Sequence, residues 1–159
     1  MLGVESGLVF ALTATALLTS CSSSGEKLHL ETQLESKIDS FHAEMNEGRF
    51  GDICAAADES LCGGEGREAF LRKLAEVRGK TGAFSGKASV VLDRGLRRKV
   101  RNAFFSSETI THEQRTECDA GRAVEMFRWS VHDGKAALAG YELKQILERG
   151  KNYVIRPGD

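Results

Sequence analysis

The sequence predicts an α+β domain in which helices come first and an antiparallel sheet follows. Residues 26–79 carry apolar side chains at spacings of three and four, as amphipathic helices do. Residues 87–147 instead carry short runs rich in β-branched and aromatic side chains. An Asp-Gly pair separates the last two runs and is typical of a tight hairpin. Helices grouped ahead of consecutive strands favour an α+β fold over an alternating α/β one.

Three helices are expected in the first half of the chain. The longest covers residues 26–46 and ends at Gly48. Its predicted inner face consists of apolar residues that recur at helical spacing, namely Leu30, Leu34, Ile38, Phe41 and Met45. A short second helix is expected within residues 49–61, and a third over residues 67–79, where Gly79 and Gly82 stop it.

The second half is expected to form an antiparallel sheet. The predicted strands cover residues 87–93, 103–117, 122–131 and 135–147, and a basic loop or hairpin end is expected at 94–102. The last two strands flank Asp133 and Gly134. A type I′ turn requires positive φ at both of its central residues, which this pair tolerates. Residues 147–159 are expected to be a polar tail.

The N-terminal segment resembles the signal peptide of a bacterial lipoprotein. Residues 8–18 are apolar apart from two threonines, and they are too few to cross a membrane, which takes about 20 residues. Residues 18–21, Leu-Thr-Ser-Cys, resemble the lipobox, in which small residues precede the lipidated cysteine. The residues before the apolar run include no Lys or Arg, which departs from the usual pattern of a signal peptide.

This resemblance implies a division of the chain into four parts. Residues 1–20 would be removed, Cys21 would carry the lipid, and residues 21–29 would form a flexible tether. The folded domain would cover residues 30–146, ahead of the tail at 147–159. The implied location is the cell envelope, with lipid anchoring to a membrane. Ser22 after the cysteine implies the outer membrane, at its periplasmic face.

Composition argues against several functions. The whole chain has 22 basic and 23 acidic residues, and Glu5 is the only charged residue before Cys21, so the exported part would be neutral. A neutral chain does not attract nucleic acid electrostatically, and none is expected as a partner. No zinc-type spacing of Cys and His is present, and "GGEG" is not followed by the Lys-Ser/Thr of a phosphate loop. We therefore expect no metal and no cofactor.

The cysteines other than Cys21 permit one internal disulfide. Cys54–Cys62 is favoured because the two residues are close in sequence. In one unbroken helix they would lie about 12 Å apart, so the chain must turn between them. Pairing of Cys118 with either of them remains an alternative.

The predicted domain resembles the NTF2-like (cystatin-like) superfamily and, within it, small bacterial lipoproteins of unknown function. The resemblance covers roughly residues 38–146. The similar stretches are "FHAEMNEGRFGDICAAA" from residue 41, "FLRKLAEVRGKTGAF" from residue 70, "CDAGRAVEMFRWSV" from residue 118 and "GKAALAGYELK" from residue 134. Cys54, where the pattern has an aromatic residue, and the basic residues 94–101 depart from it. The resemblance implies a curved sheet folded around helices into a cone with a pocket.

Two interpretations of that pocket stand side by side. It would be lined by His42, Phe104, Phe105, Glu125, Phe127, Trp129 and Tyr141. As a binding domain, the protein would hold a small apolar ligand or an envelope protein, and several of these residues would simply be core. As a small enzyme of the isomerase or proton-transfer type, it would use Glu125 or Glu142 as a base beside Tyr141. For His42, a structural role is favoured over a catalytic one. The non-enzymatic function is the favoured one.

A cluster of basic residues offers a further partner. Residues 94–101 include no acid and carry Arg94, Arg97, Arg98, Lys99 and Arg101. Such a cluster attracts anionic lipid headgroups or an acidic envelope protein. The alternative is a solvated hairpin end.

Overall fold

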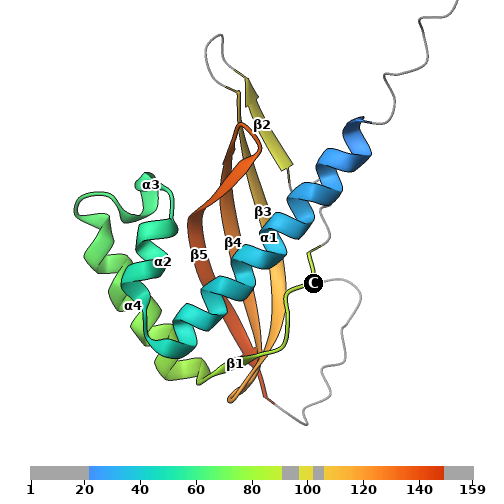
Figure 1. Cartoon of the computed structure of the whole chain (residues 1–159). Helices are drawn as coiled ribbons and strands as arrows, with labels where there is room; N and C mark the ends of the chain where they lie inside the picture. The colour runs from blue at the N-terminus through green and yellow to red at the C-terminus, as the bar shows by residue number, and fades with distance from the viewer. Residues whose placement is uncertain (1–21, 91–96, 102–105, 149–159) are drawn as a thin grey trace, which may run out of the picture.

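The computed structural model of the chain describes residues 22–90, 97–101 and 106–148. Its helices are α1 (Ser22–Glu47), α2 (Phe50–Ala56), α3 (Glu59–Cys62) and α4 (Gly66–Thr81). Its strands are β1 (Phe84–Ser85), β2 (Arg97–Arg101), β3 (Ser106–Cys118), β4 (Gly121–His132) and β5 (Lys135–Leu147). The predicted α+β class, with N-terminal helices on a curved antiparallel sheet, is confirmed (Figure 1).

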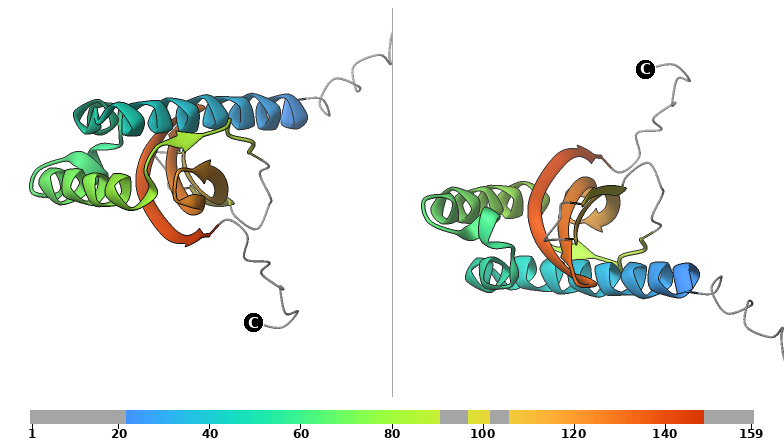
Figure 2. Two further views of the ribbon diagram at one scale, coloured as in Figure 1. Left: turned by 90° about the horizontal axis from the view of Figure 1, so that it is seen from below. Right: turned by 90° about the horizontal axis from the view of Figure 1, so that it is seen from above.

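All strand pairs in the sheet are antiparallel. The order is β1-β3-β4-β5, and β2 also pairs with β3. Figure 2 shows the strands curling into an arc, with α1 lying along one side of it. The pairing of β4 with β5 shifts register at Val124/Glu125 and at Arg128/Trp129. Such irregularities bend a strand and increase its twist, so they contribute to the curl.

The core forms where α1 packs on the inner face of the sheet. All five apolar residues predicted for the inner face of the first helix are buried, at no more than 6% exposure (Leu30, Leu34, Ile38, Phe41 and Met45). They pack in one cluster with Ile110 of β3 and with Phe127 and Trp129 of β4. The helical periodicity therefore identified the face of α1 that holds the fold together.

The predicted tight turn between the last two strands is also confirmed. Asp133 and Gly134 have φ values of 49° and 74°, and the flanking residues His132 and Lys135 pair across the turn. Two consecutive positive φ values define the type I′ geometry, whose twist matches that of the strands.

The predicted strand at residues 87–93 is wrong over its described part. Residues 87–90 lie outside any strand, and residues 91–93 lie outside the described part of the chain. The cause is that α1 side chains bind this backbone: the N–H of Ala88 donates to Asp39 at 2.8 Å, and the N–H of Val90 donates to Glu35 at 2.9 Å. Backbone donors that a helix satisfies in this way need no strand partner.

The basic stretch differs from its prediction as a loop or hairpin end. Residues 97–101 form β2, which pairs along residues 110–106 of β3. β3 is 13 residues long, and β1 pairs with only one end of it. Without β2, the backbone groups along the rest of this edge of β3 would have no strand partner. The need to pair that edge outweighs the low strand propensity of a charged run.

The second predicted helix, at 49–61, is divided into α2 and α3. Asp58 breaks it, because its side chain accepts the N–H of Ser60 at 2.9 Å as an N-cap. Its own N–H donates to the carbonyl of Leu138 on β5 at 2.8 Å. The hydroxyl of Ser130 on β4 also donates to the Asp58 carboxylate, and these side-chain bonds lower the pKa of Asp58. The break therefore docks the helical segment on the sheet.

Candidate functional site

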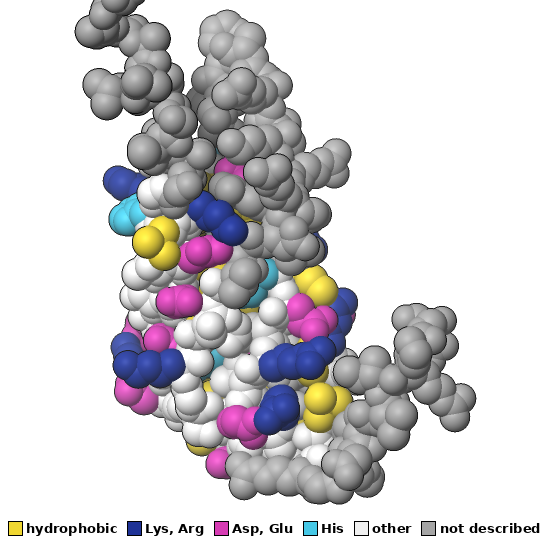
Figure 3. All heavy atoms as spheres, turned by 90° about the vertical axis from the view of Figure 1, so that its right-hand side faces the viewer, with side chains coloured by type: hydrophobic (Ala, Val, Ile, Leu, Met, Phe, Trp, Pro, Cys, Tyr) yellow, Lys and Arg dark blue, Asp and Glu magenta, His cyan; other side chains and the backbone are white. Residues whose placement is uncertain are grey.

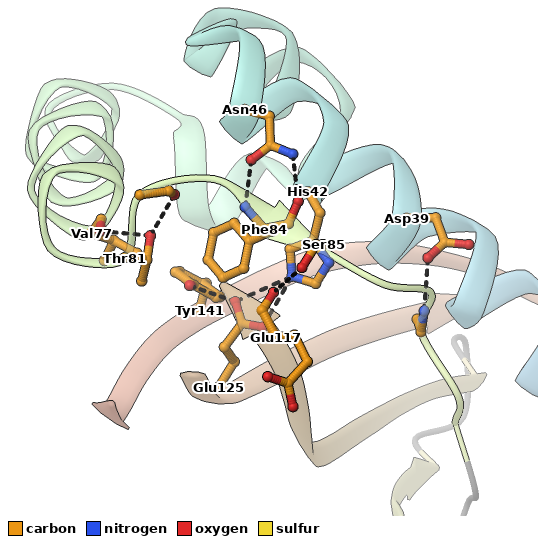
Figure 4. Close-up of polar contacts among 12 residues, drawn as sticks. Asp39, His42, Asn46, Val77, Thr81, Phe84, Ser85, Glu117, Glu125 and Tyr141 are labelled. Carbon is orange, nitrogen blue, oxygen red and sulfur yellow. Dashed lines mark hydrogen bonds and ion pairs between the residues drawn. The ribbon is translucent and has the colours of Figure 1, made fainter. Parts of the chain in front are cut away.

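A carboxylate is enclosed between α1 and the sheet. Glu125 of β4 is fully buried, and its side chain extends toward α1 (Figure 4). Its Oε2 lies 3.0 Å from Nε2 of His42, and its Oε1 accepts the hydroxyl of Tyr141 at 2.8 Å. The helix α1 and the consecutive strands β4 and β5 thus meet at one acidic side chain.

Each of the two partners of Glu125 is fixed by packing. The ring of His42 stacks on Phe84 at a centroid distance of 4.5 Å. Asn46, one turn further along α1, holds Phe84 by accepting its N–H at 2.7 Å and donating to its carbonyl at 2.9 Å. The ring of Tyr141 packs on Phe127, its neighbour across β4 and β5, at 5.1 Å. The network is therefore held rigidly from both the helix and the sheet.

Burial dominates the electrostatics of the network. It raises the pKa of the Tyr141 phenol, and the charge of Glu125 raises it further. Tyr141 consequently stays protonated and remains a hydrogen-bond donor to the carboxylate. Burial also lowers the pKa of His112 from 6.5 to about 4, although the charge of Glu125 acts in the opposite direction. His112, on β3, is consequently neutral near pH 7.

The predicted pocket residues are brought together, but as packed core. Phe127, Trp129 and Tyr141 are 0%, 2% and 5% exposed. The ring of Phe41 fits edge-on against Phe127 at 5.3 Å, and Phe127 stacks on Trp129 at 5.8 Å. Phe104 and Phe105 lie outside the described residues. Around Phe127, aromatic rings pack against one another where the sequence predicted a pocket.

Glu142, the other predicted base, points away from the network. It is an exposed residue of β5, and it pairs with Lys144 at 2.9 Å. That partner lowers the pKa of Glu142. An acid with a lowered pKa in solvent is a poor proton acceptor near neutral pH, so Glu142 is poorly suited to act as a base.

Sequence reasoning missed an open cleft beside this core. It measures about 220 Å³ and lies between α1, α2 and the inner face of β4 and β5. Its lining consists of Lys37, Ser40, Phe41, Glu44, Ile53, Ala56, Trp129 and Leu138. Neither Glu125 nor His42 lines it. Of the residues predicted to line a pocket, Trp129 borders this cleft. A second sequence signal was that the polar residues flank Phe41 at helical spacing on the same side of α1.

The structure joins Cys54 and Cys62 in a disulfide. Their Cα atoms lie 5.5 Å apart, and the sulfurs are bonded at 2.10 Å. The bond ties α2 to the end of α3 across the break at Asp58. Cys118 is buried and carries a free thiol.

Several predicted features have no described side chains. Cys21 and Arg94 lie outside the described residues. Arg97, Arg98, Lys99 and Arg101 lie on β2, whose backbone alone is described. Among the residues that are described, no helix is long and apolar enough to cross a membrane, and no group of His, Cys, Asp and Glu could hold a metal ion.

One face of the described surface is chemically mixed. On the face shown in Figure 3, Lys and Arg side chains lie among acidic ones, and hydrophobic side chains form only small separate patches. Leu28, on α1, is a large hydrophobic residue that is 65% exposed.

No protein-family model matches the chain, and no curated protein matches it significantly.

Proposed function

We propose that this protein is a lipoprotein of the bacterial cell envelope, anchored through Cys21, whose NTF2-like domain acts by binding and not by catalysis. The anchor rests on the Leu-Thr-Ser-Cys sequence after a short apolar run. The NTF2-like assignment is supported by the motifs at 41–57 and 118–131, and by the curled sheet that packs on N-terminal helices.

The binding role rests on one structural observation, the enclosure of Glu125. Both carboxylate oxygens are occupied by side-chain donors, and the residue has no exposed surface. A general base must reach a substrate proton at hydrogen-bond distance, directly or through one water. Glu125 already spends its acceptors on His42 and Tyr141, so it acts as a buried tie between α1 and the sheet.

The first experiment tests the anchor. The chain is expressed in a Gram-negative host, with Cys21→Ser beside the wild type, and intact mass and detergent partitioning are measured. Loss of residues 1–20 with a lipid-sized mass gain, absent in Cys21→Ser, supports the proposal. An unprocessed, water-soluble wild type contradicts it.

A proton-transfer enzyme is the second candidate, because the Tyr141 hydroxyl and the Glu125 carboxylate are already joined at 2.8 Å. Such an enzyme would have to open the core to admit a substrate. Hydrogen exchange would then show fast exchange of the β4 amides around Glu125. Slow exchange, limited by global unfolding, would exclude this candidate.

A further inference from the structure

The cleft between α1 and α2 has the composition of a small-molecule site. Its walls are apolar, and Phe41, Ile53, Trp129 and Leu138 are each no more than 5% exposed. Lys37, Ser40 and Glu44 add polar groups along one helix face. A volume of about 220 Å³ exceeds that of an engineered cavity of roughly 150 Å³ that holds benzene. The cleft therefore has room for one ring or a short acyl chain.

The charges in the cleft indicate which ligand it would accept. Lys37 makes no hydrogen bond or ion pair with any described residue, although it is half-buried in the lining. Burial raises the pKa of Glu44, and the charge of Arg49 only partly opposes this effect. The positive charge of Lys37 is thus available to pair with an anion in the cleft, and the raised pKa of Glu44 reduces the repulsion that this anion would meet. Lys37 and Glu44 are seven residues apart, about 10 Å along the helix, so an anion at Lys37 is distant from Glu44.

We propose that this cleft binds a small monocarboxylate, whose carboxylate pairs with Lys37 and whose apolar body packs against Phe41 and Trp129. This inference rests on the proposed binding function and names its ligand class. Ser40 and Ala56 are exposed at the cleft, which gives the ligand its entrance.

The docking of α2 builds the outer wall. Ile53 and Ala56 belong to α2, which the Cys54–Cys62 disulfide ties to α3. The Asp58 N–H bond to Leu138 and the Ser130 bond to Asp58 then fix this segment on the sheet. A wall held by covalent and polar contacts keeps the cleft preformed, as small-molecule sites usually are.

Trp129 makes the proposal directly measurable, because it is the sole tryptophan of the chain and it lines the cleft. The full chain carrying Cys21→Ser, to which no lipid can be attached, is titrated with hexanoate and with 1-hexanol. Tryptophan fluorescence and calorimetry are both recorded. We expect saturable binding of hexanoate that is about 5–10-fold tighter than that of 1-hexanol, since only the carboxylate pairs with Lys37.

Three variants sharpen the test. Lys37→Gln should weaken hexanoate binding about 5–10-fold and leave 1-hexanol unchanged. Lys27→Gln is the matched control, because Lys27 lies on the same helix outside the cleft lining, and its ion pair is with Glu31. Ala56→Leu should narrow the cleft and weaken both ligands.

Equal affinity for the two ligands, an unchanged Lys37→Gln variant, or no saturable signal by either method would overturn the proposal. The anchor experiment is independent of this outcome. A lipidated protein that binds no carboxylate refutes the ligand class alone, and an unlipidated protein that binds hexanoate refutes the anchor alone.

Discussion

Two buried histidines lie near the same aromatic ring, one on the helix and one on the neighbouring strand, and they differ in their hydrogen bonding. His42 of α1 and His112 of β3 are 4% and 3% exposed, and their ring centroids lie 6.2 and 5.7 Å from that of Phe127. His42 is hydrogen-bonded to Glu125 through Nε2, whereas neither ring nitrogen of His112 has a partner among the described residues. Equal burial therefore produces a connected polar group in one region and an isolated one in the other.

This difference shows that the partner, more than the depth of burial, decides what a buried polar side chain costs. A buried donor or acceptor left unsatisfied costs about 1–3 kcal/mol, whereas a satisfied one contributes modestly to stability. We therefore expect the protein to lose stability when polar groups are removed from the network around His42. We expect it to gain stability when the imidazole of His112 is replaced by an apolar ring.

Removal of the shared acceptor should have the largest effect. Glu125→Leu leaves the His42 Nε2 and the Tyr141 hydroxyl buried without their partner, so we expect a loss of about 3–5 kcal/mol in the free energy of unfolding. Urea denaturation measures it. Glu142→Gln, an exposed acid of the neighbouring strand, serves as the control. A loss below about 1 kcal/mol for Glu125→Leu would show that the network does not tie α1 to the sheet.

His112 should make the protein sensitive to acid. Its pKa is lowered from 6.5 to about 4 in the folded state, so the unfolded state binds the proton first as pH falls. Stability is therefore complete above pH 6.5 and declines toward pH 4, by about 3 kcal/mol from this group.

His112→Phe should remove this part of the decline. Phe keeps an aromatic ring beside Phe127 and eliminates both unpaired nitrogens, so the variant should also be slightly more stable near pH 7. Urea denaturation near pH 7 and near pH 4 compares it with the wild type. An identical pH dependence in the two proteins would mean that His112 is solvated.

Tyr141→Phe tests the contact between the network and β5. It deletes one hydroxyl that donates to the carboxylate and keeps the ring on Phe127, so we expect a loss of about 1.5–3 kcal/mol, near the lower end because His42 still serves Glu125. Thermal or urea unfolding provides the measurement. No loss at all would indicate that the Tyr141 hydroxyl finds an equivalent partner elsewhere.

The smallest effect is expected on the outer face. Glu142→Gln breaks an ion pair with Lys144 between side chains that are 54% and 39% exposed. Exposed pairs contribute about 0–1 kcal/mol, so its unfolding midpoint should barely move. A large shift would show that Glu142 has a role that its exposure does not reveal.

Much of the fold followed from local pattern. The inner face of α1, the three long strands and the Asp133-Gly134 turn were predictable because helical spacing, β-branched runs and turn chemistry are local properties. The segment at 87–90 and β2 were not, because their backbone partners are supplied by distant elements. Likewise, Asp58 ends α2 through contacts with Leu138 and Ser130, which lie in the sheet.

The candidate site was predictable only in part. Alternation along β4 placed Glu125 on the face of Phe127 and Trp129, and all three are buried. Its bond to His42 joins residues 83 positions apart, which no local spacing encodes. The cleft depends on where α2 docks, so the roles of Lys37 and Ser40 in its lining emerged only from the folded arrangement.

The contacts from α1 to the segment at 84–90 have a consequence for amide hydrogen exchange. The amide protons of Phe84, Ala88 and Val90 are bonded to side chains of Asn46, Asp39 and Glu35. Their exchange with solvent deuterium should therefore follow the detachment of α1, and not the opening of the neighbouring strand pairs. The exchange rates of these three amides would therefore measure how firmly α1 is docked. Two of the amides, those of Ala88 and Val90, lie in a segment that the sequence predicts to be a strand.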